Sequence, residues 1–367
     1  MKTFAYRNSL LVTEKASNGM NKIEIDNIKK ILLIRRDNIG DLICTTPAIH
    51  ALRKKFPEAS IDVLVNSYNA DALANNPDVD KTYVYEKEKH FKNRNRLSTW
   101  LKNLKLLLKI RKQRYDVAIG CGSYSPMLER YTFLTGAKVR IGYFKKKQKF
   151  SLYNKGVVST SENVHEVIKI FNLIKPLGIE TEPGGLILWP SYLEQARFQD
   201  FKMASYKNTG KPIVAVAISA RIKKNKWPVE KFIDLIEKLL SQNSVNVLLL
   251  WAPGSMNNPT FPGDDEAADI IISRFAEKVK GYPTSTLGAL VAAISLSDVV
   301  ITLDTGSLHI ASALQKPTVA LMTKGKAQSW YPWKTKSIVL ASGDSVENTS
   351  VDDVLNAVNT LVESCGQ

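Results

Sequence analysis

The chain has 367 residues, of which 44% are hydrophobic and 23% charged; these values exclude a disordered chain, and the length predicts two α/β domains. No apolar run approaches the roughly 18–20 residues of a membrane span, so we expect none. The net charge of +16 lies almost wholly in residues 1–185, which hold 33 Lys and Arg against 18 Asp and Glu. That half should meet a polyanion, such as nucleic acid, an anionic membrane surface or a phosphorylated glycolipid, unless the charge is only a solvated surface.

The first half of the chain alternates short apolar runs with helical segments. Residues 1–27 show no strong period and read as an extension that lacks the apolar core of a signal peptide. A turn at 36–41 precedes a predicted helix at 42–56, which carries Pro47 near its start. Strands are predicted at 30–35, 60–65, 81–85, 115–120 and 138–141. Such alternation is typical of a parallel, doubly wound sheet.

Two basic segments stand out in this half. The helical segment 97–114 has Lys and Arg around an apolar stripe made of Leu97, Trp100, Leu101, Leu104, Leu107 and Leu108. It could lie on an anionic membrane, but a packed crossover helix with a basic outer face is the favoured interpretation. The second segment, 145–149, is either a surface loop or an anion site on the acceptor side.

A second alternating set follows a break at Glu180–Pro190, where turn formers interrupt the pattern. This break predicts domains at 1–185 and 186–367. The terminal helix is a candidate to pack back on the first domain. Strands are predicted at 212–219, 245–251, 299–303 and 318–322, and helices at about 227–240, 266–278, 286–296, 308–314 and 351–362.

The most informative stretch is 297–322, a strand–turn–helix–strand unit. Its turn holds Asp304, Thr305, Gly306 and Ser307, and His309 follows in the first helical turn. In open α/β sheets, ligands bind beyond the carboxyl ends of strands, where helix N-termini offer free N–H groups to anions. This turn could therefore hold a phosphate. The alternative is that Asp304 or Thr305 only caps the helix.

Several classes of site are excluded by their missing motifs. The sequence has no GxxxxGK[ST] loop, no HExxH and no GxSxG. With four histidines and no spaced pair, we expect no metal site. The three cysteines, Cys44, Cys121 and Cys365, form no CxxC pair, so we expect free thiols and a cytoplasmic protein.

Three segments together resemble a known family. Residues 35–65 (RRDNIGDLICTTPAIHALRKKFPEASIDVLV) look like the first motif of the family 9 glycosyltransferases, the lipopolysaccharide-core heptosyltransferases. Residues 218–232 (ISARIKKNKWPVEKF) are similar to their donor loop and 301–322 (ITLDTGSLHIASALQKPTVALM) to their second motif. The resemblance spans roughly residues 28–325.

The resemblance implies a GT-B fold, in which two doubly wound Rossmann-like domains face a cleft. The N-terminal domain would bind the acceptor and the C-terminal domain the nucleotide sugar. The implied reaction is inverting, metal-independent transfer of a heptose from ADP-heptose to the inner core of lipopolysaccharide, with no cofactor. The alternatives are a GT-B transferase that uses another nucleotide sugar, or a non-catalytic sugar-nucleotide-binding module.

The matching motifs imply roles for single residues. Asp41 would be the base, unless it only caps its helix, and Lys224 or Lys226 would face the diphosphate, because Asn225 occupies the family's lysine position. The donor would be bound by Ser219, Ala220, Asp265, Asp304, Thr305, Gly306, Leu308 and His309. Arg130, Lys145 and Lys147 are candidates for binding the acceptor.

The basic half suits an anionic lipopolysaccharide-core acceptor. We therefore expect a peripheral protein at the cytoplasmic face of the inner membrane, and no nucleic-acid partner.

Overall fold

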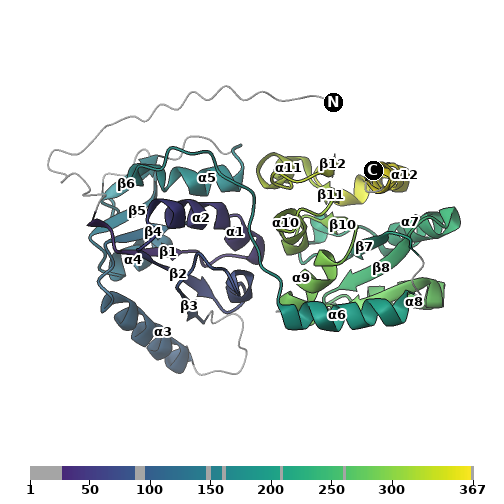
Figure 1. Ribbon diagram of the computed structural model, residues 1–367, viewed down its shortest axis with the longest axis horizontal. Helices are drawn as coiled ribbons and strands as arrows, with labels where there is room; N and C mark the ends of the chain where they lie inside the picture. Colours follow the sequence, from purple (N-terminus) through teal and green to yellow (C-terminus); the bar gives the residue numbers. More distant parts are fainter. Residues whose placement is uncertain are drawn as a thin grey trace.

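The structure, a computed structural model, describes residues 27–86, 96–145, 150–158, 163–206, 210–258 and 262–364. The extension predicted at 1–27 lies outside this range except for its last residue, and so do Lys147 and Cys365. The described chain forms two α/β lobes side by side, each built on a six-stranded, wholly parallel sheet (Figure 1).

The first sheet has the strand order β3-β2-β1-β4-β5-β6. The chain adds strands on one side of β1 up to β3 and then on the other side from β4, so the strand order reverses between β1 and β4 although all strands are parallel. Its strands are β1 (Lys30–Ile34), β2 (Ser60–Asn66), β3 (Lys81–Tyr85), β4 (Val117–Gly120), β5 (Val139–Phe144) and β6 (Lys155–Val158). The helices of this half are α1 (Ile39–Ile43), α2 (Thr46–Lys55), α3 (Arg96–Arg111), α4 (Pro126–Leu134) and α5 (Glu166–Asn172).

The second sheet repeats this topology as β12-β11-β10-β7-β8-β9, and its reversal lies between β7 and β10. Its strands are β7 (Ile213–Ala217), β8 (Asn246–Trp251), β9 (Val279–Pro283), β10 (Val299–Leu303), β11 (Thr318–Met322) and β12 (Ser337–Ala341). The helices are α6 (Tyr192–Ser205), α7 (Val229–Gln242), α8 (Asp265–Phe275), α9 (Leu287–Ser295), α10 (Gly306–Ala313), α11 (Lys324–Trp330) and α12 (Val351–Glu363).

One prediction about a helix is wrong. The helix expected at 42–56 is two helices, α1 and α2, because Pro47 lies at the start of α2 and has no N–H to continue the preceding helix. The terminal helix α12 packs against α7 and strands β10–β12. Its buried side chains, Val354, Ala357, Val358 and Leu361, join the hydrophobic cluster of the second sheet and not the first lobe.

The segment 97–114 also differs from its favoured interpretation. It forms α3, but only Thr99 and Ile110 among its described side chains are buried, and four large apolar side chains of the stripe are exposed: Trp100, Leu101, Leu104 and Leu108. It is a crossover helix between β3 and β4 that packs through Ile110, but its outer side exposes apolar as well as basic side chains. Within the described ranges, no helix is both long and apolar enough to cross a membrane.

The two lobes share one continuous hydrophobic cluster, which includes Leu33 of β1 and Ile310 of α10. Between them, α1 packs against α10 (Figure 1). The connecting segment is tied to both lobes, since Thr46 Oγ1 accepts from the amide of Ile187 at 2.9 Å and the Gly184 carbonyl accepts from Trp333 Nε1 at 2.8 Å. The reversal points of both sheets thus meet across one interface, which is where α/β sheets bind ligands.

Candidate active site

Asp41 lies on α1, at the surface where the two lobes meet. Its side chain is 15% exposed. Oδ1 accepts from Arg35 Nη2 at 2.7 Å, and Oδ2 accepts from the backbone amide of Asn38 at 3.0 Å and from Asn38 Nδ2 at 2.9 Å. The bond to the Asn38 amide caps the start of α1, so Asp41 has the capping role that the sequence left open as the alternative.

A buried guanidinium orients this carboxylate. Arg35 Nη2 also donates to Glu166 at 2.7 Å, and Nη1 donates to the carbonyl of Cys121 at 2.8 Å. Burial works to lower the pKa of Arg35, but the charges of Asp41 and Glu166 outweigh it and hold the pKa above its usual value. Arg35 therefore stays charged and fixes the Asp41 side chain in one orientation.

On the facing lobe, the turn after β10 leads into α10. Thr305 is the N-cap residue, but no side-chain cap hydrogen bond is found there in the described structure. Its hydroxyl instead contacts Ser307 Oγ at 2.8 Å, which in turn contacts Thr302 Oγ1 at 2.5 Å. The first amides of α10 therefore lack the side-chain partner that simple capping would supply.

Asp304 braces this turn. Asn225 Nδ2 donates to the Asp304 carbonyl at 3.2 Å and to Asp304 Oδ2 at 3.1 Å. Burial raises the pKa of Asp304, and the nearby charges of Lys326 and Lys224 oppose that rise. Asn225 is thus a buried structural residue that holds Asp304.

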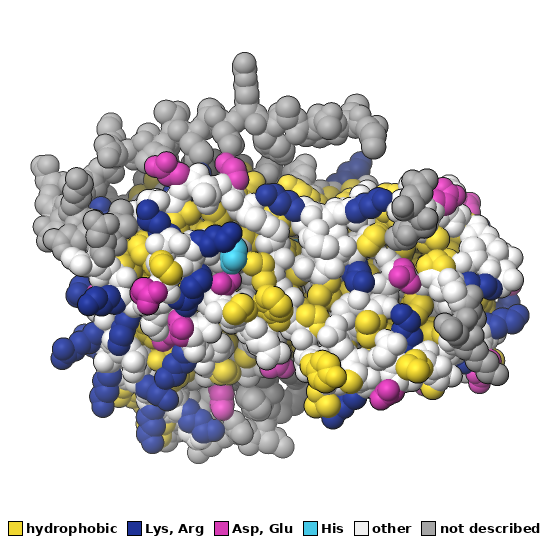
Figure 2. All heavy atoms as spheres, in the orientation of Figure 1, with side chains coloured by type: hydrophobic (Ala, Val, Ile, Leu, Met, Phe, Trp, Pro, Cys, Tyr) yellow, Lys and Arg dark blue, Asp and Glu magenta, His cyan; other side chains and the backbone are white. Residues whose placement is uncertain are grey.

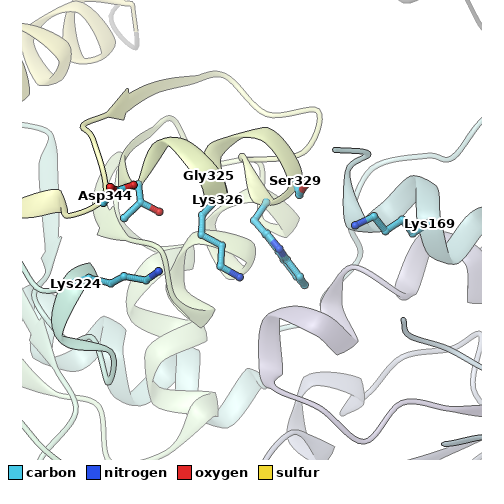
Figure 3. Close-up of a pocket in the computed structure, with 8 residues that line it drawn as sticks. Lys169, Lys224, Gly325, Lys326, Ser329 and Asp344 are labelled. Atoms are coloured by element: carbon cyan, nitrogen blue, oxygen red, sulfur yellow. The ribbon is translucent and has the colours of Figure 1, made fainter. Parts of the chain in front are cut away.

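Beside this turn, three lysines line a cavity of about 300 Å³ that opens between the lobes. Lys224 comes from the 3₁₀ turn Lys223–Asn225, Lys326 from α11 and Lys169 from α5 of the other lobe. Figure 3 shows Lys224 and Lys326 extending into the same space. The rest of the lining is Thr323, Gly325, Ser329, Trp330 and Asp344. With one carboxylate against three ammonium groups, the cavity suits an anion.

The other lysine candidate is engaged elsewhere. Lys226 Nζ pairs with Asp264 Oδ1 at 2.8 Å. Asp265 accepts from Trp251 Nε1 and from the Gly254 amide, both at 2.8 Å. Ser219 Oγ accepts from the Ala252 amide at 2.8 Å, and Ala220 is buried. Ser219 and Ala220 follow β7, so they lie at the reversal point of the second sheet.

Leu308 and His309 are buried in the first turns of α10. His309 Nδ1 lies 3.6 Å from Cys44 Sγ, and its ring makes an edge contact with Trp330 at 5.8 Å between centroids. Burial lowers the pKa of His309 to about 4, with Asp41 opposing the shift, so the ring is neutral at pH 7. His309 therefore lies inside the contact between the lobes.

The acceptor candidates do not converge on this site. Arg130 is exposed on α4, and Lys145 Nζ lies 5.2 Å from the centre of the Tyr124 ring. Lys147 is outside the described residues. Within the described part of the chain, no three His, Cys, Asp or Glu side chains gather as a metal site would require.

Four residues of the site were not assigned from the sequence: Arg35, Glu166, Lys169 and Lys326. Arg35 stands inside the first motif and could have been noticed there. Glu166 meets it from 131 positions away, and Lys169 and Lys326 reach the cavity through the tertiary fold. For these three, no local pattern gives a signal.

Known proteins match most of the chain. The model of glycosyltransferase family 9 (heptosyltransferase) matches residues 103–355. Lipopolysaccharide heptosyltransferase 3 of Escherichia coli is 24% identical over 350 residues, which cover 89% of this chain and 97% of that protein.

Two solved structures share the fold. A family 9 glycosyltransferase from Veillonella parvula has a TM-score of 0.77 at 20% identity and covers 92% of this chain and 98% of its own. The ADP-heptose lipopolysaccharide heptosyltransferase II of Escherichia coli has a TM-score of 0.72 at 20% identity, covering 92% of this chain and all of its own. The predicted GT-B fold is confirmed. Because the family model covers more than half of its length, the chain belongs to glycosyltransferase family 9, the heptosyltransferase family.

Proposed function

We propose that the protein transfers a heptose from ADP-heptose to the inner core of lipopolysaccharide, with inversion at the anomeric carbon and without a metal ion. The observation that carries this proposal is the packing of α1, which bears Asp41, against α10, which follows the turn Asp304–Ser307 on the other lobe. The family and the likeness to the ADP-heptose enzyme of Escherichia coli support the choice of donor.

In this proposal, Asp41 is the general base. An inverting displacement needs a base on the face of the sugar opposite the leaving group, within reach of the acceptor hydroxyl. The hydroxyl loses its proton to Asp41 as its oxygen attacks the anomeric carbon, and the bond from that carbon to the diphosphate breaks. Arg35 and the amide of Asn38 hold the carboxylate ready, so little reorganisation is needed when the proton moves.

Protein groups stabilise the departing diphosphate. The uncapped first amides of α10 supply partial positive charge, and Lys224 supplies a full charge from the adjacent cavity. Lys226 is the weaker candidate because Asp264 already neutralises it. Ser219, Ala220 and Asp265 complete the donor side of the cleft, and the acceptor is bound by the basic first lobe at the cytoplasmic face of the inner membrane.

The decisive experiment is Asp41→Asn, which keeps the size of the side chain and one of its two accepting oxygens and removes the base. We expect kcat to fall by about 10²–10⁴-fold while calorimetry shows unchanged affinity for ADP-heptose. A variant that transfers heptose at the normal rate would refute the assignment of the base.

Two further measurements test the donor and the metal. Calorimetry should rank ADP-sugars above UDP- and GDP-sugars, and a clear UDP preference would point to another transferase of the same fold. Turnover should persist in EDTA; its loss there, and recovery on adding a divalent cation, would contradict metal independence.

A further inference from the structure

The outward face of α3 is apolar, although solvent surrounds it. Thr99 and Ile110 are buried and mark the side that faces the sheet. At about 100° per residue, Leu101 and Leu108 point to the opposite side. Trp100 is 55% exposed, Leu101 43%, Leu104 37% and Leu108 51%. These four side chains form one stripe that points away from the molecule.

Further exposed apolar side chains lie on the neighbouring helix α4. Arg111 Nη1 on α3 donates to the carbonyl of Leu134 at 3.3 Å, which brings the C-terminal ends of the two helices together. Phe133 and Leu134 are each 45% exposed there, and the guanidinium of Arg140 lies 5.5 Å from the centre of the Phe133 ring. We call the six exposed apolar residues the α3–α4 patch: Trp100, Leu101, Leu104, Leu108, Phe133 and Leu134.

Positive charge borders this patch. The segment 96–114 contains no Asp or Glu. Its exposed basic residues are Lys102, Lys105, Lys109, Arg111, Lys112 and Arg114. In Figure 2, Lys and Arg side chains gather at the lower left, where Figure 1 places α3. A helix with an outward apolar stripe and a basic flank has the composition of helices that lie in a membrane interface.

We propose that the α3–α4 patch docks on an anionic lipid surface, with its apolar side chains among the acyl chains and its lysines at the lipid phosphates. The positive charge beside the patch favours an anionic lipid surface over a second copy of the chain. A second copy of the chain would bring the same basic flank against itself, whereas anionic headgroups neutralise it. The proposal deepens the proposed function, on whose membrane location it rests, by naming the surface that meets the lipid, and it does not depend on which sugar is transferred.

The test uses the full chain and vesicles of two compositions. We expect co-sedimentation with phosphatidylglycerol–phosphatidylethanolamine vesicles, much less with phosphatidylcholine vesicles, and release as the salt concentration rises. The double variant Leu101→Gln, Leu108→Gln should bind the anionic vesicles about tenfold more weakly or worse, because each leucine loses its burial in lipid. Both side chains are exposed, so the fold should remain.

The matched control is Leu193→Gln on α6, which replaces a leucine that is 58% exposed on the other lobe and should leave vesicle binding unchanged. Equal sedimentation of the double variant and the parent would overturn the proposal. So would a parent dimer, seen by size-exclusion chromatography, that the double variant dissociates. Because the readout is binding to lipid, either result leaves the assignment of Asp41 to be decided by its own rate measurement.

Discussion

At the scale of single residues, two carboxylates share Arg35 and have different roles. One neutralises the buried guanidinium, and the other reaches the contact between the lobes. Glu166 is buried and shares Arg35 Nη2 with Asp41. The guanidinium would be costly to bury without a counter-charge, and Glu166 supplies one that never meets solvent. Asp41 is thereby held in place and still reaches the contact between the lobes.

The candidate lysines for the diphosphate also differ, in whether a carboxylate already pairs with them. Lys224 and Lys326 both act on Asp304 electrostatically, and both line the cavity, whereas Lys226 is already paired with Asp264. A charge that is free to meet the diphosphate should matter more in the transition state than one that is neutralised.

We therefore expect Lys224→Gln to lower kcat by about 10²-fold and Lys326→Gln to lower it by a similar or smaller factor. Lys226→Gln should cost less than Lys224→Gln. Steady-state rates with saturating donor measure this, and exposed Lys324→Gln on α11 is the matched control. A larger loss for Lys226 than for Lys224 would reverse the assignment.

At the scale of helices and strands, the fit of α1 against α10 leaves no room for a side chain at Gly40. A Cβ at this position would lie 2.3 Å from His309 Cδ2, which is closer than real Cβ contacts. The ring cannot give way easily, since it is buried between Cys44 and Trp330.

Gly40→Ala should therefore force the two lobes apart and lower turnover at least about tenfold, because the proposed base and the groups proposed to bind the diphosphate lie on opposite lobes. Turnover and thermal melting measure the effect. Gly184→Ala is the control, since a Cβ there would meet nothing within 4 Å. Normal turnover of Gly40→Ala would mean that α1 and α10 need not meet so closely.

The same scale shows what the sequence could predict. Strands β10 and β11 were placed correctly because every residue in them is buried, which gives a continuous apolar run. The missed strands β6, β9 and β12 are all edge strands with partly exposed residues. A continuous apolar run is absent from β6 and β9, whereas β12 has one at 338–341 that was not recognised. For α3, the periodicity predicted a helix correctly, but it could not say which face meets the sheet.

At the scale of the whole molecule, the sequence could predict the two parallel sheets but not how they join. Each motif turn is made of residues that are consecutive in the sequence. The junction between the lobes depends instead on pairs that are far apart along the chain, such as Cys44 with His309 and His165 with Tyr331. The junction is also where burial has changed acid–base behaviour most clearly among the described histidines.

His165 and His309 are both buried at this junction as neutral rings. His165 Nδ1 accepts from the amide of Val167 at 3.1 Å and Nε2 donates to the Tyr331 carbonyl at 2.9 Å, which leaves no position for a second proton. Burial lowers the pKa of His165 to about 3 and that of His309 to about 4, below the usual value of about 6.5. At pH values between these lowered pKa values and the usual value, the unfolded chain binds more protons than the folded one.

The contribution of the two neutral histidines to the free energy of unfolding should consequently be fully present above about pH 6.5. It should fall as the pH is lowered towards 4, by on the order of 1 kcal/mol per pH unit for each histidine. Urea unfolding at pH 7 and pH 5 measures this loss. His165→Phe, which keeps an aromatic ring beside Tyr331 and Trp333, should be less stable at pH 7 but lose less between the two pH values. Phe198→Leu is the control, since it weakens the core without a titrating group and should shift both measurements equally. If His165→Phe lost as much stability as the parent between pH 7 and pH 5, the buried neutral ring at 165 would not be a source of the acid sensitivity.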